Sequence, residues 1–407
     1  MPSDQEWKSV PGGVTAAAGY LAWATHAGIS PTGSARKPDL AVIHSERAAV
    51  AAATFTTNLV KAAPVRVSAV HLRSASVRAI VLNSGNANAC TGLPGIQAAQ
   101  RMARSTAAAL GLKEKQVLVC STGRIGVPLP VEKIEQAMAR MIRRSGRGGS
   151  ARAARAIMTS DTRPKEAAVQ FSLRGRLVTI GGIAKGAGMI DPNMATMLCA
   201  MTTDASIGKL HLQRALSEAV EHSFNRITVD GDMSTNDTVI LLANGPTDGL
   251  LIRPGTAEFD RFQAALTYLC RQFARLIVLD GERVSKFVEV RVTGAATRID
   301  ARRAADAVAN SMLVKCAWYG SDPNWGRILD AVGYSGARVR EELVDIFYNG
   351  VSAVHGGVAS RTPLAKIKEV VRAPQFTVHI NLHLGTAEHT IYTTDLTPAY
   401  VRFNMGE

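Results

Sequence analysis

The segment KGAGMIDPNMATMLCAMTTDA, residues 185–205, changes abruptly from loop character to strand character. Glycines and a proline crowd the stretch up to Ala195, and an apolar run follows Thr196. Glycine and proline mark turns and loops, whereas a short apolar run is typical of a buried strand. A threonine preceded by a small alanine therefore stands at the point where a loop enters the core.

The position of Thr196 permits an intramolecular reaction. Its Oγ can attack the carbonyl of Ala195 through a five-membered ring, and hydrolysis of the resulting ester cuts the chain. The freed amine has an ordinary pKa of about 7.7–8.0, so it can accept the proton of its own hydroxyl and activate it as a nucleophile. The small Ala195 leaves room for the tetrahedral intermediate. An Ala-Thr pair alone does not distinguish this chemistry from a threonine that simply opens a strand.

Other common catalytic motifs are missing from the sequence. There is no G-x-S-x-G, no G-x-x-x-x-G-K-[ST] and no H-E-x-x-H, and GAGMID lacks the third glycine of a dinucleotide fingerprint. In FTVHINLHL, residues 376–384, His379 and His383 share one face of an alternating strand. No third ligand stands at a suitable local spacing, so we expect a solvated sheet face and no metal site.

Size and charge limit the possible classes of protein. The 407 residues are 46% hydrophobic and 5% aromatic, which is enough for a large core or two packed domains. The formal net charge of +14 is concentrated partly in residues 139–158. We interpret this segment as a solvated helix end, a flexible Gly/Ser loop at 145–150 and a new helix start. RNA binding is the alternative, although no aromatic residue is interleaved for base stacking. The arginines concerned are Arg143, Arg144, Arg147, Arg152 and Arg155.

The cysteines and the N-terminal sequence favour a cytoplasmic protein. Five cysteines lie far apart, the number is odd and no C-x-x-C occurs, which disfavours a disulfide framework or a zinc ribbon and fits a reducing compartment. MPSDQEWKSV has no secretory signal pattern. The apolar stretch VTAAAGYLAWATHAGIS is interrupted by Thr, Gly and His, so we do not expect it to span a membrane.

Periodicity predicts mixed α and β elements in several layers. Short β-branched runs ending in turn residues predict strands at 40–45, 78–84, 116–121, 176–184, 238–245 and 288–294. Amphipathic patterns predict helices at 93–112, 131–144 and 256–278.

Ordered sequence blocks along nearly the whole chain carry a family resemblance. KGAGMIDPNMATML closely resembles the self-cleavage and nucleophile motif of the ornithine acetyltransferases, also called glutamate N-acetyltransferases or ArgJ proteins of the arginine pathway. Further blocks similar to that family are FTTNLVKAAPV (55–65), LNSGNANACTG (82–92), STGRIGVPLP (121–130), MTSDTRPK (158–165), VDGDMSTNDT (229–238), DGERVSKFVEV (280–290), DPNWGRI (322–328) and TTDLTPAYVRFN (393–404).

The resemblance implies a two-step acetyl transfer. Thr196 would take acetyl from N-acetylornithine, release ornithine and pass the acetyl group to glutamate; some members also acetylate glutamate from acetyl-CoA. It implies cleavage between Ala195 and Thr196, an oxyanion hole at Thr122 and Gly123, and no metal or redox cofactor. Substrate-binding positions map onto Thr159, Lys185, Thr196, Glu282 and Asn404.

The family architecture implied is an α/β fold, an αββα sandwich like that of the self-cleaving aminopeptidases. Residues 1–195 would form an α chain and residues 196–407 a β chain, with two copies of each in the assembly. No nucleic-acid or membrane partner is expected.

Three departures from the family pattern concern substrate binding. Arg283 replaces the glycine that usually follows Glu282, Asp191 adds a carboxylate before the nucleophile, and the chain ends in FNMGE without the usual aromatic residue and terminal Ser or Thr. We therefore expect a C-terminal substrate contact to be missing or replaced. Three alternatives stay open: a hydrolase on the same scaffold (an aminoacylase or aminopeptidase), a relative that cleaves itself but does not turn over, and a basic RNA-binding protein.

Overall fold

The computed structural model describes residues 7–30, 37–143, 146–191, 197–246 and 251–406. The chain divides into two compact units. Unit 1 consists of the described residues within Met1–Gly186, Asn193–Asn225 and Met233–Ala274. Unit 2 consists of the described residues within Ala187–Pro192, Arg226–Asp232 and Arg275–Glu407. These units do not follow the 195/196 boundary, which concerns cleavage of the chain; Ala195 and Thr196 themselves lie outside the described residues.

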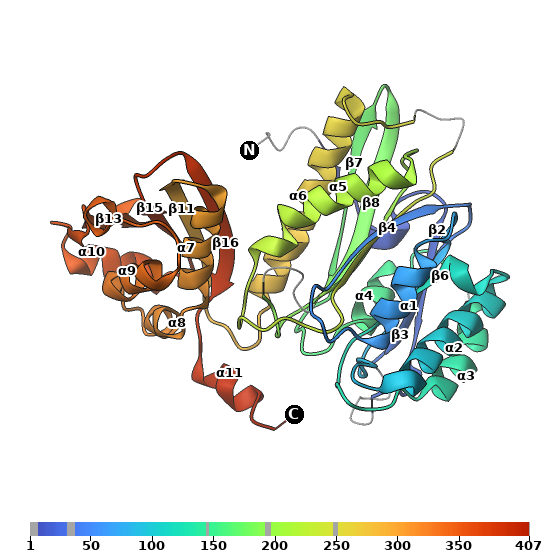
Figure 1. Ribbon diagram of the computed structural model, residues 1–407. Helices are drawn as coiled ribbons and strands as arrows, with labels where there is room; N and C mark the ends of the chain where they lie inside the picture. Colours follow the sequence, from blue (N-terminus) through green and yellow to red (C-terminus); the bar gives the residue numbers. More distant parts are fainter. Residues whose placement is uncertain (1–6, 31–36, 144–145, 192–196, 247–250, 407) are drawn as a thin grey trace. The chain divides into compact units, whose positions relative to one another are not determined.

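Unit 1 contains two β-sheets (Figure 1). The large sheet has the order β1-β7-β8-β9-β10-β4 and the small sheet the order β2-β3-β5-β6. The strands of the large sheet are β1 (Lys8–Ser9), β4 (Val50–Phe55), β7 (Lys165–Leu173), β8 (Arg176–Lys185), β9 (Leu198–Thr203) and β10 (Thr238–Ala243). Those of the small sheet are β2 (Tyr20–Thr25), β3 (Leu40–Ser45), β5 (Ala79–Asn83) and β6 (Val117–Ser121).

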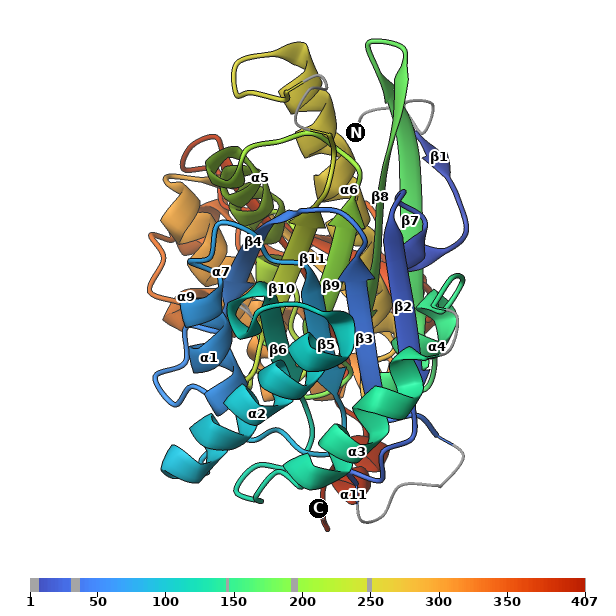
Figure 2. The same cartoon turned by 90° about the vertical axis from the view of Figure 1, so that its right-hand side faces the viewer.

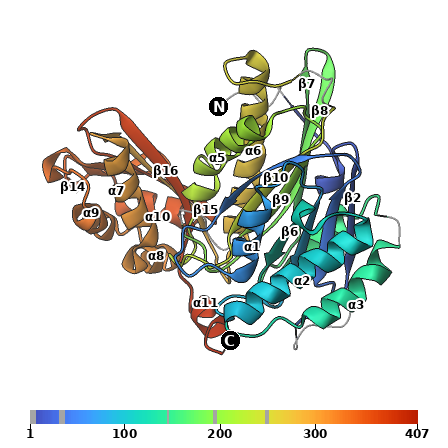
Figure 3. The same ribbon diagram turned by 45° about the vertical axis from the view of Figure 1, so that its right-hand side comes forward.

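Helices cover the outer faces of both sheets of unit 1, and one short helix contributes to the core between the sheets. The helices are α1 (Ala63–His71), α2 (Gly92–Leu110), α3 (Val131–Ile142), α4 (Ser150–Ala156), α5 (Lys209–Glu221) and most of α6 (Ala257–Leu279), with short 3-10 helices at Gly13–Thr15, Glu114–Gln116 and Phe224–Arg226. The small sheet lies behind α2 and α3 in Figure 2, and α5 and α6 lie on the far side of the large sheet in Figure 3.

Two buried clusters explain this layering. Alternate side chains of the small sheet, such as Ile43 and Leu82, meet Ile240 and Leu242 of the large sheet, and α4 contributes to the same core. The opposite side chains of the small sheet pack against α1, α2 and α3. On the outer face of the large sheet, Cys270 of α6 lies against Met201 of β9. The expected αββα order is thus confirmed in unit 1.

β9 occupies an interior position in the large sheet. It pairs antiparallel with β8 and parallel with β10, and all six of its residues are buried. β10 in turn pairs with β4, so two strands that follow residue 196 in the sequence lie between strands that precede it.

Unit 2 contains a sheet of order β14-β13-β12-β15-β11-β16 together with helices, most of which contribute to its buried core. Its strands are β11 (Phe287–Ala295), β12 (Asp345–Tyr348), β13 (Val351–His355), β14 (Val358–Ala359), β15 (Gln375–Asn381) and β16 (Ala387–Thr394). Its helices are α7 (Arg298–Asn310), α8 (Met312–Tyr319), α9 (Trp325–Tyr334), α10 (Leu364–Arg372) and α11 (Pro398–Phe403), with a 3-10 helix at Glu341–Leu343.

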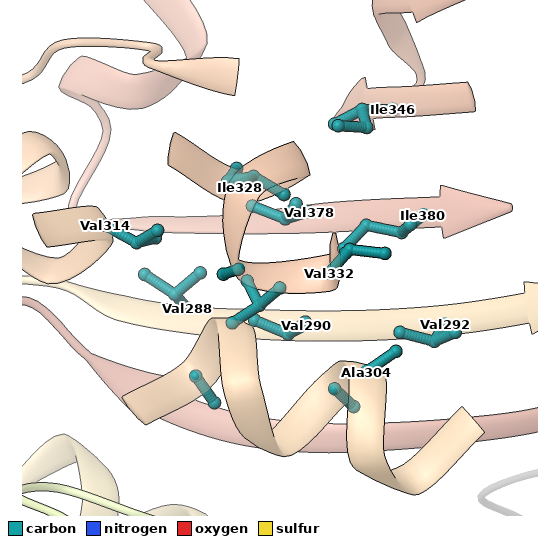
Figure 4. Close-up of a cluster of buried hydrophobic side chains, with 14 of the residues drawn as sticks. Val288, Val290, Val292, Ala304, Val314, Ile328, Val332, Ile346, Val378 and Ile380 are labelled. Carbon is teal, nitrogen blue, oxygen red and sulfur yellow. The ribbon is translucent and has the colours of Figure 1, made fainter. Parts of the chain in front are cut away.

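The core of unit 2 forms because strand residues alternate between faces. Val288, Val290 and Val292 of β11 and Val378 and Ile380 of β15 point toward the helices, where they meet the buried side chains shown in Figure 4. A chain of this composition thus supports two separate cores, as its length permits.

The two histidines of FTVHINLHL occupy different settings. β15 ends at Asn381, so His383 lies beyond the strand, with φ 51°. His379 Nε2 lies 2.8 Å from Thr293 Oγ1, and His383 Nε2 lies 2.9 Å from Asp345 Oδ2. The described residues contain no group of three or more His, Cys, Asp or Glu side chains placed to hold a metal ion.

The predicted strands and helices are all present, with bounds that differ by a few residues. The loop predicted at 145–150 ends earlier than expected, because Ser150 begins α4, and two of its glycines lie close to β2. A Cβ on Gly149 would lie 1.8 Å from the Ala22 carbonyl oxygen, and one on Gly146 would lie 2.5 Å from the Trp23 ring. These glycines allow close packing on β2. No helix in the described ranges is long and apolar enough to cross a membrane.

Candidate active site

Lys185 ends β8 at the edge of the sheet where β9 begins. Lys185 pairs in register with Leu198, and Leu198 also pairs with Thr238 of β10. The sequence places Thr196 two residues before Leu198. Sheet pairing therefore fixes Lys185 next to the strand that continues from the predicted nucleophile.

The Lys185 ammonium is buried between two of the predicted site residues. Its Nζ donates to Thr159 Oγ1 at 2.7 Å and to Thr122 Oγ1 at 3.3 Å, and Lys185 is 2% exposed. The structure thus brings together Thr122, Thr159 and Lys185, which the sequence separates by up to 63 residues. A buried ammonium must be paired and hydrogen-bonded to be tolerated.

Asp161 holds this group together. Its Oδ1 accepts from Lys165 Nζ at 2.7 Å and from the Gly186 N–H at 2.8 Å, and its Oδ2 accepts from the Thr159 N–H at 3.0 Å. Oδ2 also lies 4.0 Å from Lys185 Nζ. Burial by itself would raise the pKa of Asp161, but the two ammonium groups and the Gly186 N–H together lower it to about 2. Asp161 is therefore ionised at neutral pH and fixes Thr159, Lys185 and the turn after β8.

Thr122 and Gly123 follow β6 in a turn that only glycine permits. Gly123 has φ 134°, and a Cβ there would lie 2.4 Å from the backbone carbon of Gly85. The Thr122 N–H donates to the Asn83 carbonyl at 3.0 Å, and Asn236 Nδ2 donates to the Ser121 carbonyl at 2.8 Å. The turn is thus held by the segments around residues 83–87 and 236.

The donors of this turn are available to a ligand. Within the described part of the chain, the Gly123 N–H has no hydrogen-bond acceptor, and the Thr122 hydroxyl accepts from Lys185 without donating to a protein group. An N–H and an O–H on adjacent residues can both donate to one developing oxyanion. The donation from Lys185 polarises the Thr122 O–H and makes it a stronger donor.

Asp237 fixes the start of β9. Its Oδ1 accepts from the Met197 N–H at 2.9 Å, while the Thr238 N–H donates to the Met197 carbonyl at 3.1 Å. Asp237 is fully buried, and burial raises the pKa of its carboxyl well above the ordinary value despite the Met197 N–H. Both backbone groups of the residue after Thr196 are therefore bonded.

Glu282 and Asn404 meet in unit 2. Asn404 Nδ2 donates to Glu282 Oε2 at 3.3 Å, and the Glu282 N–H donates to the Ala187 carbonyl at 2.9 Å. A Cβ on Gly188 would lie 2.3 Å from the Glu282 carboxyl carbon. Gly188 therefore leaves the space that the Glu282 side chain occupies.

Asp230 orders the segment that leads toward the predicted cleavage site. Its Oδ2 accepts from the Met189 N–H at 2.7 Å and from the Tyr400 hydroxyl at 3.1 Å, and its Oδ1 accepts from the Ile190 N–H at 2.8 Å. Met189 has φ 56°, a left-handed conformation that costs about 1–2 kcal/mol for a residue with a side chain. The hydrogen bonds of Asp230 offset that strain.

Arg283 points toward α11. Its φ of 55° explains why glycine suits this position, and its guanidinium lies 4.8 Å from the centroid of the Phe403 ring. The Thr397 hydroxyl donates to the Arg283 carbonyl at 2.7 Å. The guanidinium of Arg283 therefore packs on the aromatic ring of Phe403 in α11.

We expect Arg283→Gly to have little effect on turnover. The substitution relieves backbone strain of about 1 kcal/mol and removes a cation–π contact of about 0.5–1 kcal/mol. The free energy of unfolding should change by less than about 1 kcal/mol, and kcat should stay within twofold of the original. Steady-state kinetics and thermal unfolding check this; a tenfold rise in kcat would show that Arg283 suppresses activity.

Asp191 lies in an acidic surrounding in unit 2. Burial first, and then the carboxylates of Asp306, Asp230 and Asp232, raise its pKa to about 7, although Asn310 Nδ2 donates to its Oδ1 at 3.3 Å. The carboxylate that departs from the family pattern therefore titrates near neutral pH.

Asp191→Asn should stabilise the protein at high pH only. When folding raises the pKa of a carboxyl, the protein loses stability as the pH rises from the unfolded pKa of about 3.9 toward the folded pKa. The difference in melting temperature between Asp191→Asn and the original should grow from pH 4 to pH 7 and then level off. Thermal unfolding at four pH values tests this, with the exposed Asp260→Asn as the control. An equal difference at pH 5 and pH 8 would contradict it.

The site residues thus form two groups, each described within its own unit. Unit 1 brings together Thr122, Thr159 and Lys185, and unit 2 brings together Glu282 and Asn404; Thr196 lies outside the described residues. The sequence blocks MTSDTRPK and VDGDMSTNDT contain Asp161, Asp230 and Asp237, but the sequence did not predict a role for these three residues. An aspartate within a block of Gly, Ser and Thr could have indicated backbone anchoring, because Asp accepts from nearby N–H groups.

The family model described as the ArgJ family matches residues 21–406. The chain belongs to the ArgJ family. It is 46% identical over 399 residues to the "Arginine biosynthesis bifunctional protein ArgJ" of Symbiobacterium thermophilum, covering 98% of each chain. It is 44% identical over 407 residues to the "Glutamate N-acetyltransferase" of Methanocaldococcus jannaschii, covering 97% of this chain and 98% of that one.

A solved structure of the ArgJ family is also similar. Ornithine acetyltransferase of Mycobacterium tuberculosis, in complex with ornithine, is 40% identical, with a TM-score of 0.42, over 46% of this chain and 98% of that chain. The family model and the two sequence relatives confirm the resemblance to the arginine-pathway acetyltransferases.

Proposed function

We propose that the protein transfers acetyl from N-acetylornithine to glutamate in arginine biosynthesis, through an acetyl-Thr196 intermediate formed after cleavage between Ala195 and Thr196. Family membership supports the reaction. The observation that carries the mechanism is the adjacent pair of donors at Thr122 and Gly123, which have no acceptor among the described residues and lie beside the Lys185 ammonium.

In the first half-reaction, the Thr196 amine accepts the proton of Thr196 Oγ as Oγ attacks the acetyl carbonyl. The Thr122 hydroxyl and the Gly123 N–H donate to the oxyanion that forms. Collapse of the tetrahedral intermediate breaks the carbon–nitrogen bond, and the ornithine amine leaves with the proton. In the second half-reaction, the glutamate amine attacks the acetyl ester, and Thr196 Oγ recovers its proton.

Substrate contacts at Thr159, Lys185, Thr196, Glu282 and Asn404 are part of this proposal. An amino-acid substrate carries a carboxylate, and ornithine adds an ammonium, so a lysine and a glutamate supply charges of both signs. Asn404, which donates to Glu282, would orient that carboxylate.

Thr122→Val should reduce kcat strongly while leaving the fold intact. Valine has the shape of threonine but donates no hydrogen bond, and loss of one oxyanion donor costs about 2.7–4 kcal/mol, or about 10²–10³ in kcat. Steady-state kinetics should show this loss with KM little changed. Thr267→Val on α6 is the matched control, and an equal loss in both variants would contradict the role of Thr122.

Residues 1–195 and 196–407 would stay associated after cleavage. β9 and β10 are paired with β8 and β4 across the predicted cut, which supports one shared sheet. We further propose an assembly of two copies of each piece and a cytoplasmic location. All five cysteines are free in the structure, which fits a reducing compartment.

An acyl-exchange assay tests the proposed function. Labelled acetyl should move from N-acetylornithine to glutamate faster than to water; faster release to water would indicate an aminoacylase or aminopeptidase on the same scaffold. A parallel reaction with acetyl-CoA decides between one activity and two, because relatives with both kinds of name are similarly identical to this chain.

A further inference from the structure

A cavity of about 400 Å³ in unit 1 is lined by three arginines that the proposed reaction does not use. Arg140 comes from α3, Arg147 from the loop after it, and Arg152 from α4. The cavity is also lined by Ala22–Thr25 of β2, here called its floor, and by His26, which follows that strand. None of the predicted catalytic or substrate-binding residues lines this cavity.

The loop that carries Arg147 is fixed in place. The Ala22 N–H donates to the Gly146 carbonyl at 2.9 Å, and the Val14 N–H donates to Ser150 Oγ at 3.1 Å. Side chains at Gly146 or Gly149 would collide with β2. The described part of the loop is therefore built onto the strand, so Arg147 is presented from a defined backbone.

The charge of the cavity is left uncompensated. None of the described residues that line the cavity is acidic, and the two glutamates of α3, Glu132 and Glu135, both pair with Arg101 of α2, at 2.7 Å and 2.6 Å. Within the described ranges, Arg140, Arg147 and Arg152 form no ion pair. Three guanidinium groups therefore face the cavity with all their donors available to a ligand.

We propose that this cavity binds a phosphorylated small molecule. Guanidinium forks match phosphate oxygens in bidentate geometry, and a phosphate group carries about −1.5 to −2 charges at pH 7, which three arginines balance better than they balance a single carboxylate. The volume is in the range of small-molecule sites, about 300–1,000 Å³. Trp23 at the floor supplies an aromatic surface beside the charged wall.

Titration calorimetry with the full-length protein in 150 mM salt tests the proposal, with inorganic pyrophosphate as the probe. One saturable site is expected. Arg147→Gln and Arg152→Gln should each weaken binding by about tenfold, the loss of one charge-assisted contact. Arg155→Gln on the same helix, exposed and outside the cavity, is the matched control and should bind as the original does.

Several results would overturn the proposal. They are no saturable binding at 10 mM pyrophosphate, an equal loss in Arg155→Gln and Arg152→Gln, or binding of citrate as tight as that of pyrophosphate. Displacement of pyrophosphate by a single-stranded RNA at lower concentration would also overturn it, because the arginines would then form part of a nucleic-acid surface. Acetyl transfer by Arg147→Gln and Arg152→Gln should remain unchanged, which separates this test from that of the proposed function.

Discussion

Thr196→Ala should give a single intact chain of 407 residues and no acetyl transfer, whereas the original protein should give two fragments of 195 and 212 residues. The substitution removes the only oxygen that can attack the Ala195 carbonyl through a five-membered ring. It also removes the acetyl carrier, and loss of a catalytic nucleophile lowers kcat on the order of 10⁶-fold. Denaturing electrophoresis with mass spectrometry reads the first effect, and the acyl-exchange assay reads the second.

Thr196→Ser is the matched control for this experiment. Serine keeps an oxygen at the same place, so the chain should still be cut and acetyl transfer should persist at a reduced rate. If intact Thr196→Ala protein transferred acetyl groups, both roles proposed for Thr196 would be wrong.

Asp161→Asn should destabilise the protein by about 3–5 kcal/mol, the cost of removing one partner from a buried ion pair. Lys165 and Lys185 would keep their charges in a buried site without the carboxylate that now lies 2.7 Å from one and 4.0 Å from the other. Because the pKa of Asp161 is lowered to about 2, its stabilising effect exists above its unfolded pKa of about 3.9 and is lost as the pH falls toward 2. Chemical denaturation at pH 7 and at pH 3.5 should show a smaller difference at the lower pH.

Lys165→Met separates stability from positioning. It leaves one ammonium with one carboxylate, and Asp161 still accepts from the Thr159 and Gly186 N–H groups. We expect Lys165→Met to lose less activity than Asp161→Asn at a temperature where both variants are folded. If the two variants lost activity equally, Asp161 would act only on stability.

Periodicity predicted much of the fold because buried strands and amphipathic helices carry local signals. The strands at 40–45 and 238–245 stand out by their β-branched residues, but β4 does not, since half of VAAATF is alanine. Its place at the edge of the large sheet depends on pairing with β10, almost two hundred residues later in the chain. Such tertiary pairing overrides local preference and leaves no local pattern.

The candidate site was predictable through family blocks and much less through chemistry. The sequence around Thr122, Thr159 and Lys185 does not indicate that these residues lie close together. They come from the end of β6, from the segment after α4 and from β8, which converge only in the folded unit. Asp161 shows the same limit. Its role depends on a lysine four residues away and on an N–H group 25 residues away.

The interleaving of β9 and β10 between β8 and β4 has a consequence for the order of events in the cell. When the ribosome has synthesised residues 1–195, β8 and β4 are present but the two strands that lie between them are not. Only β9 and β10, which are synthesised later, can complete the sheet. The cleavage proposed between Ala195 and Thr196 would therefore follow folding, and the two resulting pieces would share one sheet from the start. Separately synthesised halves should remain insoluble or unstructured until they are mixed, and mixing should restore activity only slowly.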